Sequence, residues 1–222
     1  MKRLLVLRPE PGATATAKRA RQLGLEVVAA PLFEIEPVEW EMPTFTAFDG
    51  LLLTSANAVR HGGPGLGRLQ GLPVFAVGEA TARISREAGF NVAVSGDEGV
   101  DGLLASIDSK LKLLHLCGED QMVPSCARQE IIRKSVYRAR PTGTELRGVS
   151  DVVALIHSPR AGARFSELVK NVDRQRISIA AISTAALRSA GSHWAVAEAA
   201  GSPNDEALLA LAVRLCNKTA AQ

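Results

Sequence analysis

The chain contains few aromatic residues: they make up 4% of its 222 residues, with one tyrosine and two tryptophans. That scarcity argues against the stacking platforms on which single-strand-binding proteins hold nucleic-acid bases. A net charge of +3, from 26 basic and 23 acidic residues, is also too mild for a strongly basic nucleic-acid-binding face. We therefore expect no nucleic-acid partner.

Long apolar runs are missing as well. No stretch approaches the roughly 20 apolar residues of a transmembrane helix, so we expect no membrane partner. Near the start, the apolar run Leu4–Leu7 is followed by Arg-Pro, whereas a signal peptide needs an apolar region of about 7–15 residues. Cys117, Cys126 and Cys216 are an odd number of cysteines without metal-ligand spacing. These features predict a protein of the reducing cytoplasm.

Several familiar catalytic motifs are also absent. The chain has no G-x-x-x-x-G-K-[ST] phosphate loop, and the glycine-rich run Gly62–Gly67 contains a proline and follows a helical pattern. It does not match the dinucleotide fingerprint, so a nucleotide-using α/β enzyme is disfavoured. No G-x-S-x-G elbow of an α/β-hydrolase occurs. His61, His115, His157 and His193 lack the spacing of a helix-borne metal pair, and we expect no metal site.

What the chain does have is an alternation of short apolar runs with longer amphipathic stretches. The runs that predict strands are Leu4–Leu7, Glu26–Ala30, Gly50–Leu53, Val74–Val77, Val92–Val94, Leu113–Leu116, Val152–Ile156, Ile177–Ala181 and Trp194–Val196. Most of them are followed by Gly, Ser or Thr and then by a helical pattern. This alternation predicts an α/β fold with parallel sheets covered by helices.

Two segments break that rhythm. Phe33–Glu39 alternates apolar and acidic residues, and Ser135–Arg140 alternates apolar and basic ones. Alternation is typical of a half-exposed strand, and opposite charges on facing strands attract each other. We interpret the two segments as a two-stranded ribbon that leaves one domain and returns to it. Two unrelated edge strands are the alternative interpretation.

Small hydroxyl residues or glycine follow four of the predicted strands. These loops are Thr54–Asn57, Gly78–Thr81, His157–Arg160 and Ser183-Thr184. In open α/β sheets ligands bind at this edge, where free backbone N–H groups and the helix dipole attract carboxylate or phosphate. Helix capping by Ser or Thr explains any one loop better. Four such loops together predict a ligand cleft lined with anion-binding groups.

Five further side chains have either a functional or a structural interpretation. Arg8 directly follows the first predicted strand, where it could meet an anion or pair with a nearby carboxylate. Tyr137, the only tyrosine, is either an ordinary strand residue or a neutral acid. His115 and His157 lie at strand ends and are interpreted as hydrogen-bonded core histidines rather than catalytic bases. Cys117 is interpreted as a small core residue.

In combination and in order, these features resemble the uroporphyrinogen-III synthases of the tetrapyrrole pathway. The segments that carry the resemblance are Leu5–Pro9, Pro31–Pro37, Leu53–Val59, Ala76–Ala82, Val136–Arg138, Ser158–Arg160, Ser202-Pro203 and Ala207-Leu208. Each segment is a weak signal alone. Their order and spacing along essentially the whole chain make the resemblance specific.

The resemblance implies two doubly wound parallel-sheet domains of the flavodoxin or Rossmann type. They are joined by the two-stranded β-ribbon linker, and the active cleft lies between them. On this basis we expect a first domain of residues 1–35 and 142–222, a linker of residues 36–40 and 135–141, and a second domain of residues 41–134. We expect a monomer.

The resemblance also implies an enzyme without metal or organic cofactor. Its expected substrate is hydroxymethylbilane, a linear tetrapyrrole with eight carboxylates. Loss of the terminal hydroxyl gives an azafulvene, and a spiro intermediate then allows closure to uroporphyrinogen III with ring D inverted. Because the substrate closes spontaneously to isomer I, the protein mainly has to orient it. The rival interpretation is a non-catalytic two-domain binding protein for an anionic small molecule.

By the same resemblance, Tyr137 matches the tyrosine that assists departure of the hydroxyl. The expected substrate-binding residues are Arg8, Thr54, Ser55, Asn57, Gly78, Thr81, Gly118, Ser158, Arg160, Ser183 and Thr184. The chain departs from many relatives at Ala185-Ala186, where they have paired threonines. It also departs at Cys117–Asp120, where they have basic residues, and this makes the loop a weaker carboxylate binder.

Overall fold

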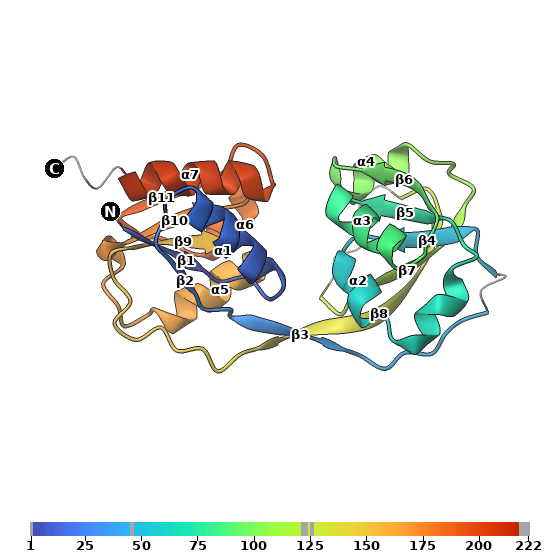
Figure 1. Cartoon of the computed structure of the whole chain (residues 1–222), viewed down its shortest axis with the longest axis horizontal. Coiled ribbons are helices and arrows are strands. Elements are labelled where there is room, and N and C mark those ends of the chain that lie inside the picture. Colours follow the sequence, from blue (N-terminus) through green and yellow to red (C-terminus); the bar gives the residue numbers. More distant parts are fainter. Residues whose placement is uncertain (1, 45–46, 121–123, 125–126, 218–222) are drawn as a thin grey trace. The chain divides into compact units, whose positions relative to one another are not determined.

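A computed structural model describes residues 2–44, 47–120, 124 and 127–217 of the chain. Cys126, one of the three cysteines considered above, lies outside the described residues. The chain divides into two compact units, Met1–Glu34 with Pro141–Gln222, and Ile35–Arg140. Figure 1 follows the chain from one unit into the other and back. The first unit is therefore built from both ends of the sequence.

The first unit contains a five-stranded parallel sheet. Its strands are β1 (Arg3–Val6), β2 (Val27–Ala29), β9 (Val152–Ile156), β10 (Ile177–Ala181) and β11 (Val196–Ala199). They are ordered β11-β10-β9-β1-β2, and every neighbouring pair is parallel. Its helices are α1 (Gly12–Gln22), α5 (Pro159–Leu168), the short 3-10 helix η3 (Arg174–Arg176), α6 (Thr184–Ser189) and α7 (Asp205–Asn217).

Helices cover both faces of this sheet. Leu4 and Val6 of β1 share an apolar cluster with residues of α1 and α7, while α5 and α6 pack against β9 and β10 and against each other. Gly162 allows that close approach, since a β-carbon there would lie 2.8 Å from the carbonyl oxygen of Ala186. Strands buried on both faces read as continuous apolar runs, which is why the sequence predicted them.

The second unit contains a six-stranded sheet. Its strands are β3 (Phe33–Pro37), β4 (Gly50–Leu53), β5 (Val74–Val77), β6 (Val92–Gly96), β7 (Lys112–Gly118) and β8 (Glu130–Pro141), in the order β3-β8-β7-β4-β5-β6. The neighbours from β8 to β6 pair in parallel. Its helices are α2 (Ala56–His61), the 3-10 helix η2 (Pro64–Leu69), α3 (Glu79–Glu87) and α4 (Gly99–Ala105). The predicted α/β class with parallel sheets is confirmed in both units.

The two faces of the second sheet have separate apolar clusters. Leu51 and Leu53 pack with residues of α2 and α3, whereas Leu52 packs with Leu103 and Leu104 of α4. This division follows from the alternation of side chains along a strand. By the same alternation, His115 of β7 lies on the face of Leu52 and Leu113.

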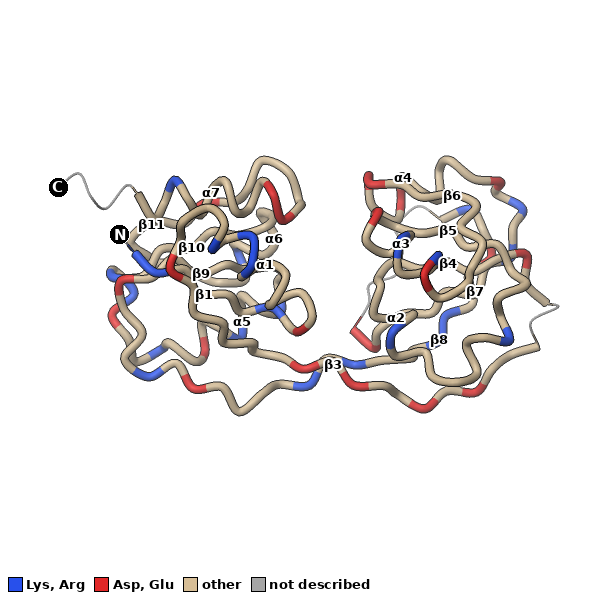
Figure 2. The backbone as a smooth tube through the Cα atoms, in the orientation of Figure 1, with Lys and Arg blue, Asp and Glu red and all other residues tan. Residues whose placement is uncertain are grey.

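Strands β3 and β8 correspond to the two segments with alternating charge. Glu36 of β3 pairs with Arg138 of β8 at 2.5 Å and with Arg140 at 3.4 Å, so the opposite charges do face each other. Figure 2 colours the acidic and basic positions along the backbone. Strand β8 begins at Glu130, earlier than the alternating segment, because its first residues pair with β7. It is thus both a sheet strand and the partner of β3.

One predicted strand is displaced. The sequence predicted Trp194–Val196, whereas β11 begins at Val196. Trp194 instead stacks on Phe165 of α5, with ring centroids 5.6 Å apart, and the Arg174 guanidinium lies 4.5 Å over the indole. Packing against α5 therefore removes the aromatic residue from the strand.

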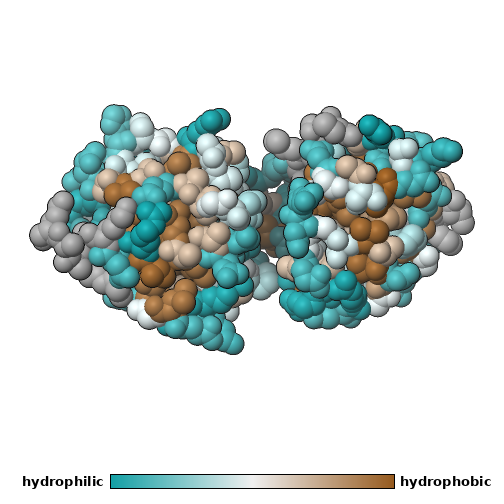
Figure 3. Space-filling view, turned by 90° about the horizontal axis from the view of Figure 1, so that it is seen from above, coloured by the Kyte–Doolittle hydropathy of each residue, from teal (hydrophilic) through white to brown (hydrophobic). Residues whose placement is uncertain are grey.

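Exposed large apolar side chains are few among the described residues. They are Leu23, Val28 and Ile132, and on the face drawn in Figure 3 hydrophilic residues border the apolar ones in each unit. In the same described part of the chain, no helix combines the length and apolar character needed to cross a bilayer.

Candidate functional site

The carboxyl ends of neighbouring strands in the second unit bring several predicted binding residues to one edge. Thr54 and Ser55 follow β4, Gly78 follows β5, Gly118 ends β7, and Tyr137 lies beside it on β8. These four strands are adjacent and parallel. Ligands of open α/β sheets bind at such an edge.

Tyr137 is the most closely held of these residues. Its side chain is buried, and the backbone of Gly118 lies directly against the ring: a β-carbon at position 118 would stand 3.2 Å from the phenolic oxygen. Burial raises the pKa of Tyr137, although hydrogen bonds with Ser55 and with the backbone of Gly118 oppose the rise. Tyr137 is therefore protonated at neutral pH and has a proton to donate.

Ser55 and Asn57 shape the loop beside Tyr137. Oγ of Ser55 accepts a hydrogen bond from the backbone N–H of Asn57 at 3.2 Å and so caps α2. The side-chain oxygen of Asn57 accepts from Nη1 of Arg60 at 3.3 Å. Ser55 thus acts as a helix cap, which was the alternative to ligand binding for this loop, and it also forms the hydrogen bond with Tyr137.

Thr54 contacts a buried histidine. Its Oγ1 lies 3.1 Å from Nε2 of His115 on β7. Burial, together with the charge of Arg133, lowers the pKa of His115 to about 4, so the ring is neutral near pH 7. The interpretation of His115 as a hydrogen-bonded core histidine is confirmed, as is that of Cys117, which is buried.

Gly78 and Thr81 belong to the start of α3. Gly78 has a φ of +81°, a conformation that favours glycine, and its carbonyl accepts from the backbone N–H of Thr81 at 3.0 Å. Thr81 is 5% exposed, so its side chain faces the core rather than the edge. Sequence spacing did not distinguish those two orientations.

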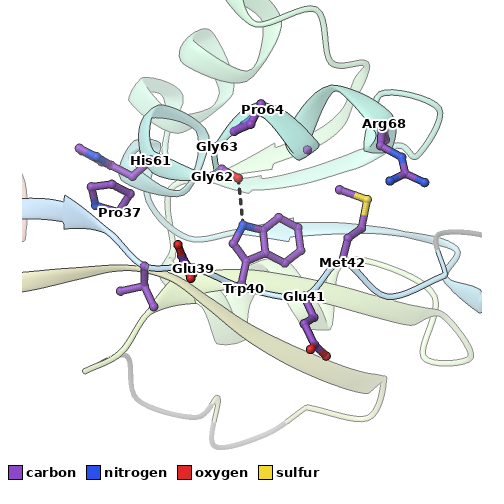
Figure 4. A pocket seen from close by; sticks show the side chains of 12 residues that line it. Pro37, Glu39, Trp40, Glu41, Met42, His61, Gly62, Gly63, Pro64 and Arg68 are labelled. Carbon is purple, nitrogen blue, oxygen red and sulfur yellow. Dashed lines mark hydrogen bonds between the residues drawn. The ribbon is translucent and has the colours of Figure 1, made fainter.

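A groove of about 820 Å³ lies in the same unit (Figure 4). Its lining residues come from two segments, 37–42 and 61–68. Trp40 is fixed by a hydrogen bond from its Nε1 to the carbonyl of Gly62 at 2.9 Å. His61 lines the groove and also lies near Tyr137, with ring centroids 6.4 Å apart. Sequence reasoning missed Trp40, whose only signal was its rarity.

The first unit has a different cluster at its strand ends. Asp205, the first residue of α7, accepts hydrogen bonds from Nη1 of Arg8 at 3.2 Å, Oγ1 of Thr16 at 3.1 Å and Nε2 of His157 at 2.9 Å. It also forms an ion pair with Arg19. Asp205 was missed from the sequence, where the start of a helix after Ser-Pro-Asn was the available signal.

The charges of this cluster follow from its contacts. Burial alone would raise the pKa of Asp205, but the hydrogen bond from His157 and the charges of Arg19 and Arg8 lower it to about 2. Burial lowers the pKa of His157. An ionised Asp205 thus accepts from a neutral His157, which confirms His157 as a hydrogen-bonded histidine.

Arg8 pairs with a carboxylate of its own chain. Its guanidinium also lies across Gly12, where a β-carbon would stand 2.5 Å from Nε. Of the two roles considered for Arg8, the carboxylate pair is present here. Substrate contact by Arg8 stays a prediction.

The remaining predicted residues of the first unit lie at helix starts. Ser158 caps α5 through the N–H of Ala161 at 3.2 Å, and Ser183 caps α6 through the N–H of Ala186 at 3.3 Å. Thr184 is the exposed first residue of α6. Arg160 lies in the first turn of α5, and its guanidinium is 4.6 Å over the ring of Phe33.

The described residues contain no group of three or more His, Cys, Asp or Glu placed to hold a metal ion.

Comparisons with known proteins point to one family. The sequence model described as "Uroporphyrinogen-III synthase HemD" matches residues 14–210. A curated uroporphyrinogen-III synthase of Chlorobaculum parvum is 34% identical over 101 residues, which span 41% of this chain and 41% of that relative's length. The aligned part is thus less than half of the relative.

Two solved structures resemble the chain over nearly its whole length. A uroporphyrinogen-III synthetase from Helicobacter pylori has 20% identity and a TM-score of 0.67, covering 97% of this chain and 100% of the other. A mutant uroporphyrinogen III synthase from Thermus thermophilus has 18% identity and a TM-score of 0.57, covering 97% and 99%. At these identities the likeness concerns the fold.

Proposed function

The chain belongs to the uroporphyrinogen-III synthase family, and we propose that it converts hydroxymethylbilane to uroporphyrinogen III with inversion of ring D. The observation that carries the proposal is the match of the family model to residues 14–210. The strand-end edge of the second unit supports it, because a protonated tyrosine lies there among backbone and hydroxyl groups. We further propose that the protein acts as a cytoplasmic monomer without nucleic-acid partner or cofactor.

Tyr137 is the proposed acid. Its phenol gives a proton to the terminal hydroxyl of the substrate, which leaves as water while the lone pair of the pyrrole nitrogen forms the azafulvene in its protonated, cationic form, opposite the phenolate of Tyr137. Closure of the macrocycle later releases a proton from a ring carbon, and this proton restores the phenol. The net change is the loss of one water. The raised pKa of Tyr137 keeps the acid form populated before the first step.

Orientation of the substrate is the larger task of the protein in this proposal. Well-positioned intramolecular reactions gain up to about 7–11 kcal/mol from orientation alone. The proposed carboxylate-binding groups of the second unit are Thr54, Ser55, Asn57, Gly78 and Gly118. Thr81 was also expected among them, but its backbone N–H is donated to Gly78 and its side chain is buried, so its proposed role is to hold this loop in place. Those of the first unit are Arg8, Ser158, Arg160, Ser183 and Thr184. Backbone N–H groups at helix starts suit such anions.

Product analysis tests this proposal. Hydroxymethylbilane generated in situ is mixed with the purified protein, the porphyrinogens are oxidised, and isomers I and III are separated. The synthase produces isomer III, whereas the alternative, a non-catalytic binding protein for an anionic small molecule, binds the substrate and leaves isomer I as the product. Isomer I alone, from protein shown to be folded, would contradict the proposed activity and favour that alternative.

A further inference from the structure

His115 is a buried titratable residue that the proposed reaction does not use. It lies within β7, and its side chain is fully buried. Alternation along β7 places it on the same face as Leu113, which packs with Leu103 and Leu104 of α4. A histidine in these apolar surroundings loses its hydration, so its few polar contacts define what it can do.

The polar contact of His115 is with the strand-end edge. In the sheet, Leu52 of β4 pairs with His115 of β7. Thr54, two residues beyond Leu52, lies on the same face, and its Oγ1 is 3.1 Å from Nε2 of the histidine. The other ring nitrogen, Nδ1, is buried and has no hydrogen-bond partner among the described residues.

The ring nitrogen that holds the proton follows from these surroundings. A neutral imidazole has one N–H and one bare nitrogen. A proton on Nδ1 would be a buried donor without an acceptor among the described residues. A proton on Nε2 is donated to Oγ1 of Thr54, and the bare nitrogen is then Nδ1, which needs no acceptor. The second arrangement costs less because buried donors are rarely left unpaired.

The ring nitrogen that carries the proton decides whether the Thr54 hydroxyl can donate a hydrogen bond to a ligand. When Oγ1 accepts from His115, the hydroxyl proton of Thr54 is free to be donated elsewhere. Thr54 is half-buried at the end of β4, so that proton can be directed to the edge. With the proton of His115 on Nδ1 instead, the Thr54 hydroxyl would donate its proton to Nε2. Only the lone pairs of Oγ1 would then face an anion.

We infer that His115 is a positioning residue that makes Thr54 a hydrogen-bond donor toward a substrate carboxylate at the strand-end edge of the second unit. This inference rests on the proposed function for the identity of the ligand. The assignment of the proton to Nε2 rests on the structure alone.

A double-mutant cycle tests the inference. His115→Leu removes the donor at similar size, and Thr54→Val removes the hydroxyl. We expect His115→Leu to raise KM for isomer III formation by roughly fivefold, as for one lost neutral hydrogen bond, because the Thr54 hydroxyl remains but is no longer oriented, with kcat little changed. In the Thr54→Val background the same change should have no further effect on KM. His115→Gln, which retains an N–H near the position of Nε2, should restore most of the affinity.

Equal effects of His115→Leu in both backgrounds would overturn the inference, because a purely structural role is additive. A second measurement does not depend on activity: ¹⁵N NMR of the wild-type protein reports which ring nitrogen of His115 is protonated. A proton on Nε2 supports the inference even if a variant fails to fold, and a proton on Nδ1 overturns it. Absence of isomer III with the wild-type protein would overturn the proposed function instead, and the NMR result would still stand.

Discussion

Gly118 lies so close to Tyr137 that a β-carbon at position 118 would stand 2.7 Å from Cε2 of the tyrosine ring. The two residues face each other on the parallel strands β7 and β8, where the register shifts beside them. The ring therefore uses the space that any other side chain at position 118 would fill. The placement of the proposed acid depends on this glycine.

Gly118→Ala should move the tyrosine. Because the ring is buried, we expect overpacking to cost about 1–3 kcal/mol of unfolding free energy and to slow isomer III formation. Gly67→Ala is the matched control, since nothing lies within 4 Å of a β-carbon there. Urea unfolding and initial rates check both. A Gly118→Ala variant as stable and as active as the control would show that the close contact does not matter.

Tyr137→Phe keeps the ring and removes the proton. We expect isomer III formation to slow by roughly tenfold to a hundredfold, at or below the lower end for general acid catalysis. The stability should change little, because the ring still packs against Gly118. Steady-state rates and urea unfolding are the measurements. An unchanged rate would remove Tyr137 from the mechanism.

Asp205→Ala should destabilise the first unit. It leaves the buried His157 without its acceptor and two arginines without their shared carboxylate. Because Arg8 and Arg19 are 32% and 53% exposed, water compensates them in part, and we expect a loss of roughly 2 kcal/mol.

Glu167→Ala is the control for that variant. Its ion pair with Arg164 is a surface contact, with the glutamate 67% exposed, and such pairs contribute about 0–1 kcal/mol. Thermal or urea unfolding compares the two variants. Equal losses of unfolding free energy in the two variants would mean that the contacts of Asp205 stabilise the fold no more than a surface ion pair does.

Acid should weaken the fold through His115. The pKa of this histidine is lowered from 6.5 to about 4 by burial and by Arg133. Between pH 6.5 and about pH 4, His115 is therefore protonated in the unfolded chain but neutral in the folded chain. The free energy of unfolding falls over this range as the pH falls. The difference between the pKa values of His115 in the unfolded and the folded chain corresponds to about 3 kcal/mol of unfolding free energy.

His115→Leu isolates this contribution. The unfolding free energy of the variant should decline less between pH 6.5 and pH 4 than that of the wild-type protein. Below about pH 4 both should lose further stability as Asp205, with a pKa of about 2, is protonated. Parallel pH profiles for the two proteins would contradict the burial of a neutral histidine at this position.

Much of the sheet structure could be predicted because parallel strands leave continuous apolar runs. Leu51–Leu53 and Val152–Ile156 are buried along their length, and both were recognisable as strands. The first part of β8 was missed since Glu130–Lys134 mixes charged and apolar residues, and only its pairing with β7 makes it a strand. The predicted boundaries of the domains and of the ribbon linker stay a prediction.

The site was less predictable because its contacts join distant residues. Capping by Ser55, Ser158 and Ser183 is a local feature, and their positions after strands were readable in the sequence. The contacts Thr54–His115 and His157–Asp205 span 61 and 48 residues. No local pattern encodes which strands become neighbours, and therefore Asp205 and the role of His115 emerged only in the fold.

The most direct test of the account is a multiple-turnover measurement of product isomers. Hydroxymethylbilane in large molar excess over the protein is allowed to react, and isomers I and III are quantified over time. The account predicts that isomer III exceeds the amount of protein many times and forms faster than isomer I. Isomer III limited to one equivalent of protein, or isomer I alone, would contradict catalysis by this chain.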